Sequence, residues 1–244
     1  MKTLVVDIGG TSVKVWKTDE RSEEFSSGKK LTPRRLVDEV KAIADDWPFR
    51  RVSVGYPGAV RNGHPSAEPY NLGRGWVEFA WSNAFGRPVR IMNDACMQAL
   101  GGYEGGRMLY LGLGTAMGTA FIFDGTVVPL ALGHLPFRNG KDFGFFLSRK
   151  GLKLHGGGVW RDAVLEAGAA LKAAFMADYV VFGGGNAKEL DDLPEGFRRG
   201  GNHNAYFGGL RMWDDAARSG SSERARVKAD VARPRPDRSR SGAR

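Results

Sequence analysis

Alternating apolar and polar positions open the chain. Residues 3–8 are a run rich in β-branched side chains, Gly9-Gly10-Thr11 follows, and residues 12–18 resume the apolar alternation. Two such runs on either side of a glycine turn are typical of a β-hairpin. The first 18 residues are therefore predicted to form two antiparallel strands.

The same pattern returns in the second half of the chain. Residues 108–113 predict a strand, Gly114-Thr115 a turn, and residues 116–123 a returning strand. Strand, Gly-Thr turn and strand thus occur twice, and a repeated unit of this kind predicts two related lobes that face a cleft.

Helical spacing of apolar residues appears at three places. Thr32 and Pro33 suit the N-cap and first position of a helix that continues with Leu36, Val37, Val40 and Ile43. A second helix is predicted after Asp94 and a third over 160–176. Further strands are predicted at 51–56, 89–92 and 178–182. Residues 133–158 are rich in Gly and Phe without a clear period, which predicts an elaborated loop region.

Composition places the chain among soluble globular proteins. It has 244 residues, of which 42% are apolar and 26% charged, and no apolar run approaches the length of a membrane span. The N-terminal residues lack the apolar core of a signal peptide, so a cytoplasmic protein without a membrane partner is expected. Cys96 is the only cysteine, which excludes intramolecular disulfides and cysteine-rich zinc sites.

The positive charge is concentrated at the C-terminal end. Residues 215–244 hold nine Lys or Arg and four Asp or Glu, so they contribute +5 of the net +9. This segment has almost no large apolar residues and is predicted to be a disordered, solvated tail. A contact between the tail and a polyanion is the alternative, and no specific nucleic-acid partner is expected.

Two turns carry candidate phosphate chemistry. Glycines allow backbone N–H groups to approach an anion closely, so Gly9-Gly10-Thr11 could cradle a phosphate, with Asp7 as a ligand for Mg²⁺. A tight hairpin with an Asp-capped turn explains the same residues. Gly114-Thr115 forms a second such turn, and two turns on two lobes could hold a phosphate chain from both sides.

Asn93-Asp94 lies where a predicted strand passes into a helix. Both residue types are ordinary helix caps. Alternatively, Asp94 accepts a proton from an attacking hydroxyl while Asn93 bonds a neighbouring one, because phosphoryl transfer needs mainly positioning and charge stabilisation. His134 could donate to a sugar hydroxyl or be a structural histidine.

Seven segments together resemble the ROK family of sugar kinases, and within it the polyphosphate glucokinases. The resemblance covers about residues 1–214 in the family's order and rests on Asp7-Ile8-Gly9-Gly10-Thr11, Gly55-Tyr56-Pro57-Gly58, Asn71-Leu72-Gly73-Arg74-Gly75-Trp76, Asn93-Asp94-Ala95, Gly112-Leu113-Gly114-Thr115-Ala116-Met117-Gly118, Leu132-Gly133-His134 and Gly183-Gly184-Gly185-Asn186.

The resemblance implies a role for each matching residue. Asp94 matches the catalytic base, and Asn71, Asn93 and His134 match sugar-binding positions. Gly9, Gly10 and Thr11 match the first phosphate loop, Gly114 and Thr115 the second, and Gly183, Gly184 and Gly185 the turn beside a nucleotide's adenosine. The implied fold is the α/β actin-like ATPase, or sugar-kinase, fold with two ribonuclease-H-like lobes, here 1–104 and 105–214.

The implied activity is transfer of a phosphoryl group from ATP or polyphosphate to a hexose, most simply glucose to glucose 6-phosphate, with Mg²⁺. A homodimer follows by analogy. ROK repressors add an N-terminal helix-turn-helix, so an enzyme is expected here. Ala131 departs from the family, which usually has Glu three residues before the sugar-binding His. That departure favours a first alternative, a kinase-like sugar-binding protein with weak or no catalysis. A second alternative is a polyanion-binding module that acts through the basic tail.

Overall fold

Groups of strands alternate with helices along the chain. The computed structural model describes residues 2–201 and 203–214, so the predicted tail at 215–244 lies outside the described residues. The described residues up to Trp213 belong to one compact unit. None of the described helices combines the length and apolarity needed to cross a membrane.

The strands are β1 (Thr3–Ile8), β2 (Ser12–Trp16), β3 (Ser22–Ser26), β4 (Arg51–Tyr56), β5 (Val60–Arg61), β6 (His64–Pro65), β7 (Val89–Asn93), β8 (Arg107–Leu113), β9 (Met117–Phe123), β10 (Thr126–Leu130), β11 (Tyr179–Gly183) and β12 (Phe197–Arg199). The helices are α1 (Pro33–Ile43), α2 (Trp81–Phe85), α3 (Asp94–Gly101), α4 (Phe143–Leu147), α5 (Arg149–His155), α6 (Gly157–Ala174) and α7 (Asn204–Arg211), with short 3₁₀ turns η1 (Leu132–His134) and η2 (Ala187–Glu189).

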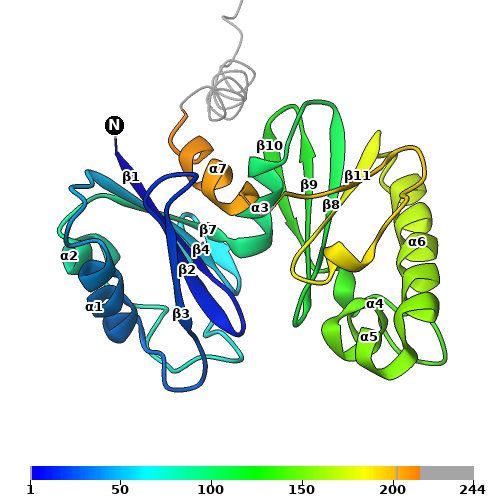
Figure 1. Ribbon diagram of the computed structural model, residues 1–244, viewed down its shortest axis with the longest axis horizontal. Coiled ribbons are helices and arrows are strands. Elements are labelled where there is room, and N and C mark those ends of the chain that lie inside the picture. The colour runs from blue at the N-terminus through cyan, green and yellow to red at the C-terminus, as the bar shows by residue number, and fades with distance from the viewer. Residues whose placement is uncertain (1, 202, 215–244) are drawn as a thin grey trace, which may run out of the picture. The chain divides into compact units, whose positions relative to one another are not determined.

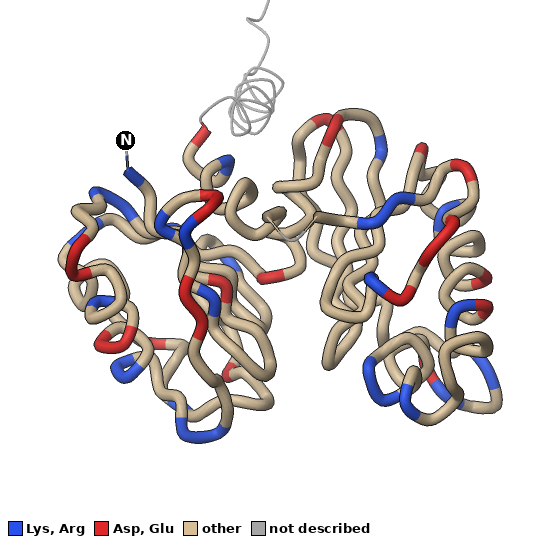
Figure 2. The backbone as a smooth tube through the Cα atoms, viewed as in Figure 1, with Lys and Arg blue, Asp and Glu red and all other residues tan. Residues whose placement is uncertain are grey.

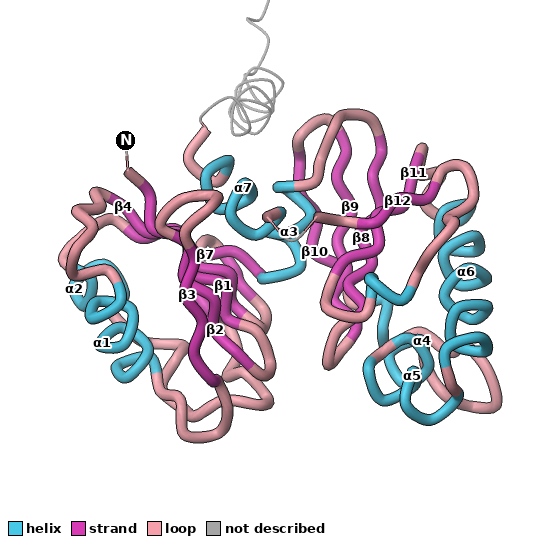
Figure 3. The backbone as a smooth tube through the Cα atoms, viewed as in Figure 1, coloured by secondary structure: helices cyan, strands magenta, loops and turns pink. Residues whose placement is uncertain are grey.

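The first sheet has the order β3-β2-β1-β4-β7 (Figures 1 and 3), and its inner strands β1 and β4 are buried on both faces. β1 runs antiparallel to β2 and parallel to β4. Successive side chains of a strand point to opposite faces. Accordingly Leu4 and Val6 pack in the cluster that contains the buried side of α1, whereas Val5 packs with α3 and α7.

Local chemistry explains where α1 begins. Thr32 has an extended backbone, and its hydroxyl accepts a hydrogen bond from the N–H of Arg35 at 3.3 Å. Pro33 occupies the first helical turn, where its missing N–H has no helical partner to lose. The predicted helix start is confirmed.

The second sheet repeats the first. Its order is β10-β9-β8-β11-β12, with β9 antiparallel and β11 parallel to β8. The buried side of α6 packs with Leu109, Leu111 and Leu113 of β8 on one face, and α3 packs with Met108 and Tyr110 on the other. Each sheet thus places a β-hairpin before its two parallel strands, which confirms the predicted repeat. The division near residue 104 stays a prediction.

Helices α3 and α7 each follow the last strand of a sheet, and they cross each other through glycines. A side-chain carbon on Gly101 would collide with the carbonyl of Asn204, and one on Gly208 would collide with the carbonyl of Met97. Gly101 therefore packs against the backbone of Asn204, four residues before Gly208, and Gly208 packs against the backbone of Met97, four residues before Gly101. The crossing leaves no room for a side chain at either glycine.

The predicted loop region at 133–158 is wrong in part. It contains α4 and α5, of five and seven residues, and the start of α6. Helices this short show no clear hydrophobic period, and Gly151 is required because a carbon there would collide with the carbonyl of Phe146. No helix is predicted at α7 either, since Gly208 and Gly209 are poor helix formers.

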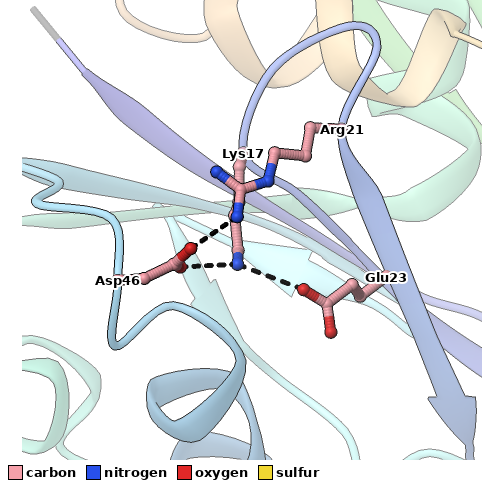
Figure 4. Close-up of polar contacts among 4 residues, drawn as sticks. All are labelled: Lys17, Arg21, Glu23 and Asp46. Atoms are coloured by element: carbon pink, nitrogen blue, oxygen red, sulfur yellow. Dashed lines mark hydrogen bonds and ion pairs between the residues drawn. The ribbon is translucent and has the colours of Figure 1, made fainter.

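A buried lysine joins the first hairpin to the segment after α1 (Figure 4). The side chain of Lys17 is only 3% exposed, and its Nζ lies 2.8 Å from Asp46 Oδ1 and 3.1 Å from Glu23 Oε1. Arg21 also contacts the Asp46 carboxylate. Buried cations in proteins are paired in this way, so the cluster is structural.

Candidate active site

One cavity of about 1330 Å³ is lined by residues of both sheets and their loops. That volume exceeds the usual range for a single small ligand, so the cavity has room for more than one. Every residue that the sequence marked as a site candidate lines this cavity: Asp7, Gly9, Gly10, Thr11, Asn71, Asn93, Asp94, Gly114, Thr115, His134, Gly183, Gly184 and Gly185. Their roles stay predictions.

The two glycine turns meet inside the cavity. The first is closed by a hydrogen bond from Gly9 N–H to the carbonyl of Ser12 at 2.8 Å. In the second, the carbonyl of Gly114 accepts from the N–H of Arg149 at 2.8 Å. A side-chain carbon on Gly10 would lie 3.4 Å from Thr115 Cβ, so the turns are neighbours.

Asn93 is the N-cap of α3, and Asp94 is the first residue of the helix, so Asp94 is not needed as the cap. The Asn93 side-chain oxygen accepts from Cys96 N–H at 3.2 Å, which is the N-cap bond. Its amide nitrogen donates to Asp94 Oδ1 at 3.0 Å and to the Gly58 carbonyl at 3.1 Å. Asp94 Oδ1 also accepts from Ala95 N–H at 2.8 Å. Asp94 is thus held through Oδ1, and no other described residue donates to Oδ2.

Asp7 is the last residue but one of β1, close enough to Asp94 for their charges to interact. Its Oδ2 accepts from the amide of Gln98 at 3.2 Å, whereas its buried Oδ1 has no hydrogen-bond partner among the described residues. An unpartnered buried carboxylate oxygen is costly unless something binds it. A side-chain carbon on Gly55 would lie 2.9 Å from this oxygen, so Oδ1 faces the neighbouring strand β4.

Both carboxyl groups are harder to ionise than usual. Burial is the main cause that raises the pKa of Asp7 to about 7, and the charge of Asp94 raises it further. Burial also raises the pKa of Asp94 to about 6, although hydrogen bonds from Ala95 and Asn93 favour its ionised form. A carboxylate with a pKa near 6 is ionised at neutral pH and more basic than an exposed one, which suits a general base.

Asp7 is the carboxylate that the sequence predicts as a ligand for Mg²⁺. Within residues 2–201 and 203–214, no group of three or more His, Cys, Asp or Glu side chains is arranged to hold a metal ion. Mg²⁺ commonly takes one or two carboxylates and completes its shell with water and phosphate oxygens. Asp7 as the carboxylate ligand stays a prediction, because its Oδ1 is buried and its Oδ2 accepts from Gln98.

Two of the predicted sugar-binding residues, Asn71 and His134, lie on surface segments fixed to the core. The loop that begins at Asn71 is held by Glu68, whose carboxylate accepts from the N–H groups of Gly75 and Trp76 at 3.1 Å each. The side chain of Trp76 is fully buried, which anchors the loop. His134 ends η1, and both it and Asn71 are exposed.

Ala131 also lines the cavity, so its small side chain leaves that part of the wall without a carboxylate. Asp142 lines the cavity too, and its backbone pairs with Pro136, two residues beyond His134. Its Oδ1 accepts from Phe145 N–H at 2.7 Å and caps α4. Asp142 is therefore a carboxylate near His134 with one oxygen already used.

Close packing also explains why glycines occupy the turn at 183–185, in addition to its predicted role in nucleotide binding. A side-chain carbon on Gly183 would collide with the hydroxyl of Tyr110. Gly184 has a φ of +77° and lies against the backbone of Leu113, both of which favour glycine. A carbon on Gly185 would lie 3.8 Å from the guanidinium of Arg149, so this turn borders a cation.

The sequence analysis did not identify the Lys and Arg side chains that line the cavity, nor the polar side chains of Gln98 and Tyr110. Lys14, Arg149 and Lys150 line it, and the stretch from 141 to 155 holds four Lys or Arg against one Asp (Figure 2). The spacing of Lys14 in β2, two residues after Ser12, was the available signal for a side chain on the cavity face. Gln98 and Tyr110 line the cavity as well.

The fold and cavity define the class: this is the actin-like ATPase and sugar-kinase fold, with two like lobes that each contribute a glycine turn. Three solved structures show the likeness. The inorganic polyphosphate/ATP-glucomannokinase from Arthrobacter sp. strain KM aligns over 91% of this chain and 99% of its own, with 24% identity and a TM-score of 0.72.

A ROK family glucokinase from Streptomyces griseus, in complex with glucose and AMPPNP, aligns over 87% of this chain and 99% of its own, with 16% identity and a TM-score of 0.67. A ROK family transcriptional regulator, a homologue of the E. coli MLC protein, covers 93% of this chain and 81% of its own, with 14% identity and a TM-score of 0.69. No protein-family model and no curated protein matches the sequence. At these identities the shared finding is the fold, and at that level the resemblance to ROK sugar kinases is confirmed.

Proposed function

We propose that this protein is a sugar kinase that transfers a phosphoryl group from ATP or polyphosphate to a hexose, glucose at its 6-hydroxyl being the acceptor to test first. The observation that carries the proposal is the arrangement in one cavity: Asp94, with Oδ2 free, shares its wall with two adjoining glycine turns. A base and a phosphate cradle are the two parts that phosphoryl transfer requires.

The chemical step uses Asp94 as the base. Its carboxylate accepts the proton of the sugar hydroxyl while that oxygen forms a bond to the terminal phosphorus of the donor. The bond between this phosphorus and its bridging oxygen breaks, and the shortened donor leaves with the bonding electrons. Asn93 holds Asp94 through Oδ1 at 3.0 Å, which leaves Oδ2 for the proton.

The turns and nearby cations bind the donor. Backbone N–H groups of Gly10, Thr11, Gly114 and Thr115 would contact phosphate oxygens, while the Gly9 N–H closes the first turn, and Lys14 and Arg149 add positive charge. Asp7 would hold Mg²⁺, which neutralises charge on the donor phosphates when bound. The excess of Lys and Arg around α5 supports a long anionic donor, and the Gly183–Gly185 turn supports a nucleotide, so both donors are tested.

The second candidate function is sugar binding with weak or no catalysis. Ala131 favours it, because a wall without a carboxylate acceptor binds sugar hydroxyls less strongly. The structural likeness to a ROK regulator is compatible with the same reading. A homodimer stays a prediction from the family resemblance.

A matrix of donors and sugars tests the proposal. Purified full-length protein is assayed with ATP and with polyphosphate against glucose, mannose and N-acetylmannosamine, and Asp94→Asn serves as the control for contaminating kinases. Turnover in the wild type that the variant lacks supports a kinase. Sugar binding by calorimetry without turnover for any pair supports the second candidate instead.

A further inference from the structure

Arg149 is the first residue of α5 and lies beside two glycine turns of the second lobe. Its backbone N–H donates to the carbonyl of Gly114 at 2.8 Å, which fixes the residue against the second phosphate turn. At the far end of its side chain, a carbon added to Gly185 would lie 3.8 Å from a terminal guanidinium nitrogen. The side chain therefore extends from the Gly114 turn to the Gly185 turn, and all three residues line the cavity.

The guanidinium of Arg149 is available to a ligand. It forms no hydrogen bond or ion pair within the part of the chain that the structure describes, and the side chain is exposed. Two lysines of the cavity wall differ, because Lys14 lies 3.9 Å from Glu24 Oε2 and Lys150 lies over the ring of Phe145. A guanidinium carries five N–H donors in a fork that fits two oxygens of one phosphate. Arg149 thus offers unused donors to an anion in the cavity.

The second phosphate turn has a different neighbour at each end. A carbon added to Gly10 would lie 3.4 Å from Thr115 Cβ, so the first phosphate turn adjoins the Thr115 end. The N–H of Asn186 donates to the carbonyl of Leu113 at 3.0 Å, so the turn before Asn186 adjoins the other end. A donor whose terminal phosphate lies between the two phosphate turns, and whose chain extends toward that third turn, passes the guanidinium of Arg149.

We propose that Arg149 is a donor-binding residue whose guanidinium contacts the inner phosphates of the donor, those that remain in the leaving group. The inference rests on the proposed function for the reaction in which the donor takes part. When the bond between the terminal phosphorus and its bridging oxygen breaks, the bonding electrons stay on that oxygen. A guanidinium beside this oxygen stabilises the new negative charge. ATP and polyphosphate share these inner phosphates, so the contact serves either donor.

A solvated surface cation is the competing explanation, since charged side chains on exposed helices commonly face water alone. In that case, removing the charge of Arg149 changes anion binding no more than removing a nearby charge does. Lys153 provides the comparison: it lies four residues further along α5, is exposed, and does not line the cavity.

The test measures ligand binding by calorimetry in the full chain without sugar, so no phosphoryl transfer is needed. Inorganic tripolyphosphate, ATP and adenosine are the ligands. Arg149→Gln removes the charge but keeps the backbone bond to Gly114, so the variant should fold, which thermal unfolding checks. We expect it to weaken each phosphate donor that the wild type binds by about ten- to a hundredfold, as loss of a hydrogen bond between charged groups does. Adenosine, which carries no phosphate, should bind the variant and the wild type alike.

Two further variants separate the fork from the charge. Arg149→Lys keeps a positive charge and loses the two-pronged geometry, so it should recover only part of the lost affinity. Lys153→Gln is the matched control and should lower donor affinity by no more than about twofold at physiological salt, because exposed charges are screened.

Equal donor affinity in Arg149→Gln and Lys153→Gln would overturn the inference. So would an equal loss of adenosine binding, a loss confined to one of two donors that the wild type binds, or a wild type that binds neither donor. The proposed function can fail separately: a wild type that binds tripolyphosphate through Arg149 but transfers no phosphoryl group to a sugar has this site without being a kinase. Conversely, turnover with a donor whose binding does not depend on Arg149 would retain the kinase and remove the inference.

Discussion

Gly10 lies against Thr115, so the glycine turns of the two lobes adjoin within one cavity. Each turn is part of a β-hairpin of its own sheet. Their contact means that one anion can be reached by backbone N–H groups of both hairpins, which a single glycine turn does not offer.

The first prediction concerns the base. Asp94→Asn keeps an oxygen that accepts from Ala95 N–H and from Asn93, so the start of α3 should keep its structure. Turnover should fall by about 10²–10⁴-fold, the usual contribution of a positioned base, with sugar affinity unchanged. Steady-state kinetics and calorimetry measure the two effects. If turnover stays within threefold of the wild type, Asp94 is not the catalytic base and has only a structural role in the first turn of α3.

The same substitution should change how stability depends on pH. The folded-state pKa of Asp94 is raised from 3.8 to about 6, so the folded protein holds its proton more tightly than the unfolded chain does. Wild-type stability should therefore fall as pH rises from about 4 to about 6, relative to Asp94→Asn. Above that window the variant should be more stable by at most about 3 kcal/mol.

Denaturant unfolding of both proteins at pH 4, 5, 6 and 8 in chelator measures this difference. A difference in unfolding free energy that does not grow between pH 4 and 6 would mean that Asp94 ionises normally in the folded protein.

Gly114→Val tests the second phosphate turn. A side-chain carbon there meets only the Ala116 carbonyl at 3.6 Å, an ordinary contact, so the fold has room for it. The side chain would instead occupy space where phosphate approaches the backbone, and KM for the donor should rise more than KM for the sugar. Gly158→Val, at the start of α6 with open space around it, is the control. If KM for the donor is equal in the two variants, Gly114 serves only to form the hairpin turn and does not contact the donor.

Ala131→Glu tests the missing acceptor. If Ala131 is the reason for weak sugar binding, Glu should raise kcat/KM for glucose by roughly ten- to a hundredfold, as expected for one hydrogen bond to a charged group. The gain should be smaller for a deoxy sugar that lacks the bonded hydroxyl. If Ala131→Glu is no better than the wild type and Asp142→Ala is inactive, Asp142 has taken the acceptor role.

The helix crossing gives a stability prediction. Gly208→Ala places a carbon against the Met97 carbonyl, and a backbone atom cannot rotate away. The substitution should cost about 1–3 kcal/mol, the usual penalty of overpacking. Gly157→Ala, with nothing nearby, should cost nothing comparable. Equal denaturation midpoints for the two variants would show that α3 and α7 separate easily.

Local signals were sufficient for much of the fold and for the list of candidate site residues. The hairpins, α1 and the start of α3 follow from alternation, caps and glycine turns, which act over a few residues. Asp94 was found because strand-to-helix junctions carry functional side chains. Gln98 and Tyr110 could not be paired from sequence, because their contact depends on how α3 packs against β8.

The final helix has a consequence for how this protein is made. Gly209 of α7 covers Val5 of β1, its carbonyl accepts from the Ser53 hydroxyl at 2.6 Å, and the Trp213 indole donates to the same hydroxyl at 2.8 Å. During synthesis, the N-terminal sheet leaves the ribosome long before these residues do. The part of this sheet's face beneath α7 therefore stays uncovered until residues 209–213 have been translated, so the first lobe to be synthesised is finished only with the end of the second.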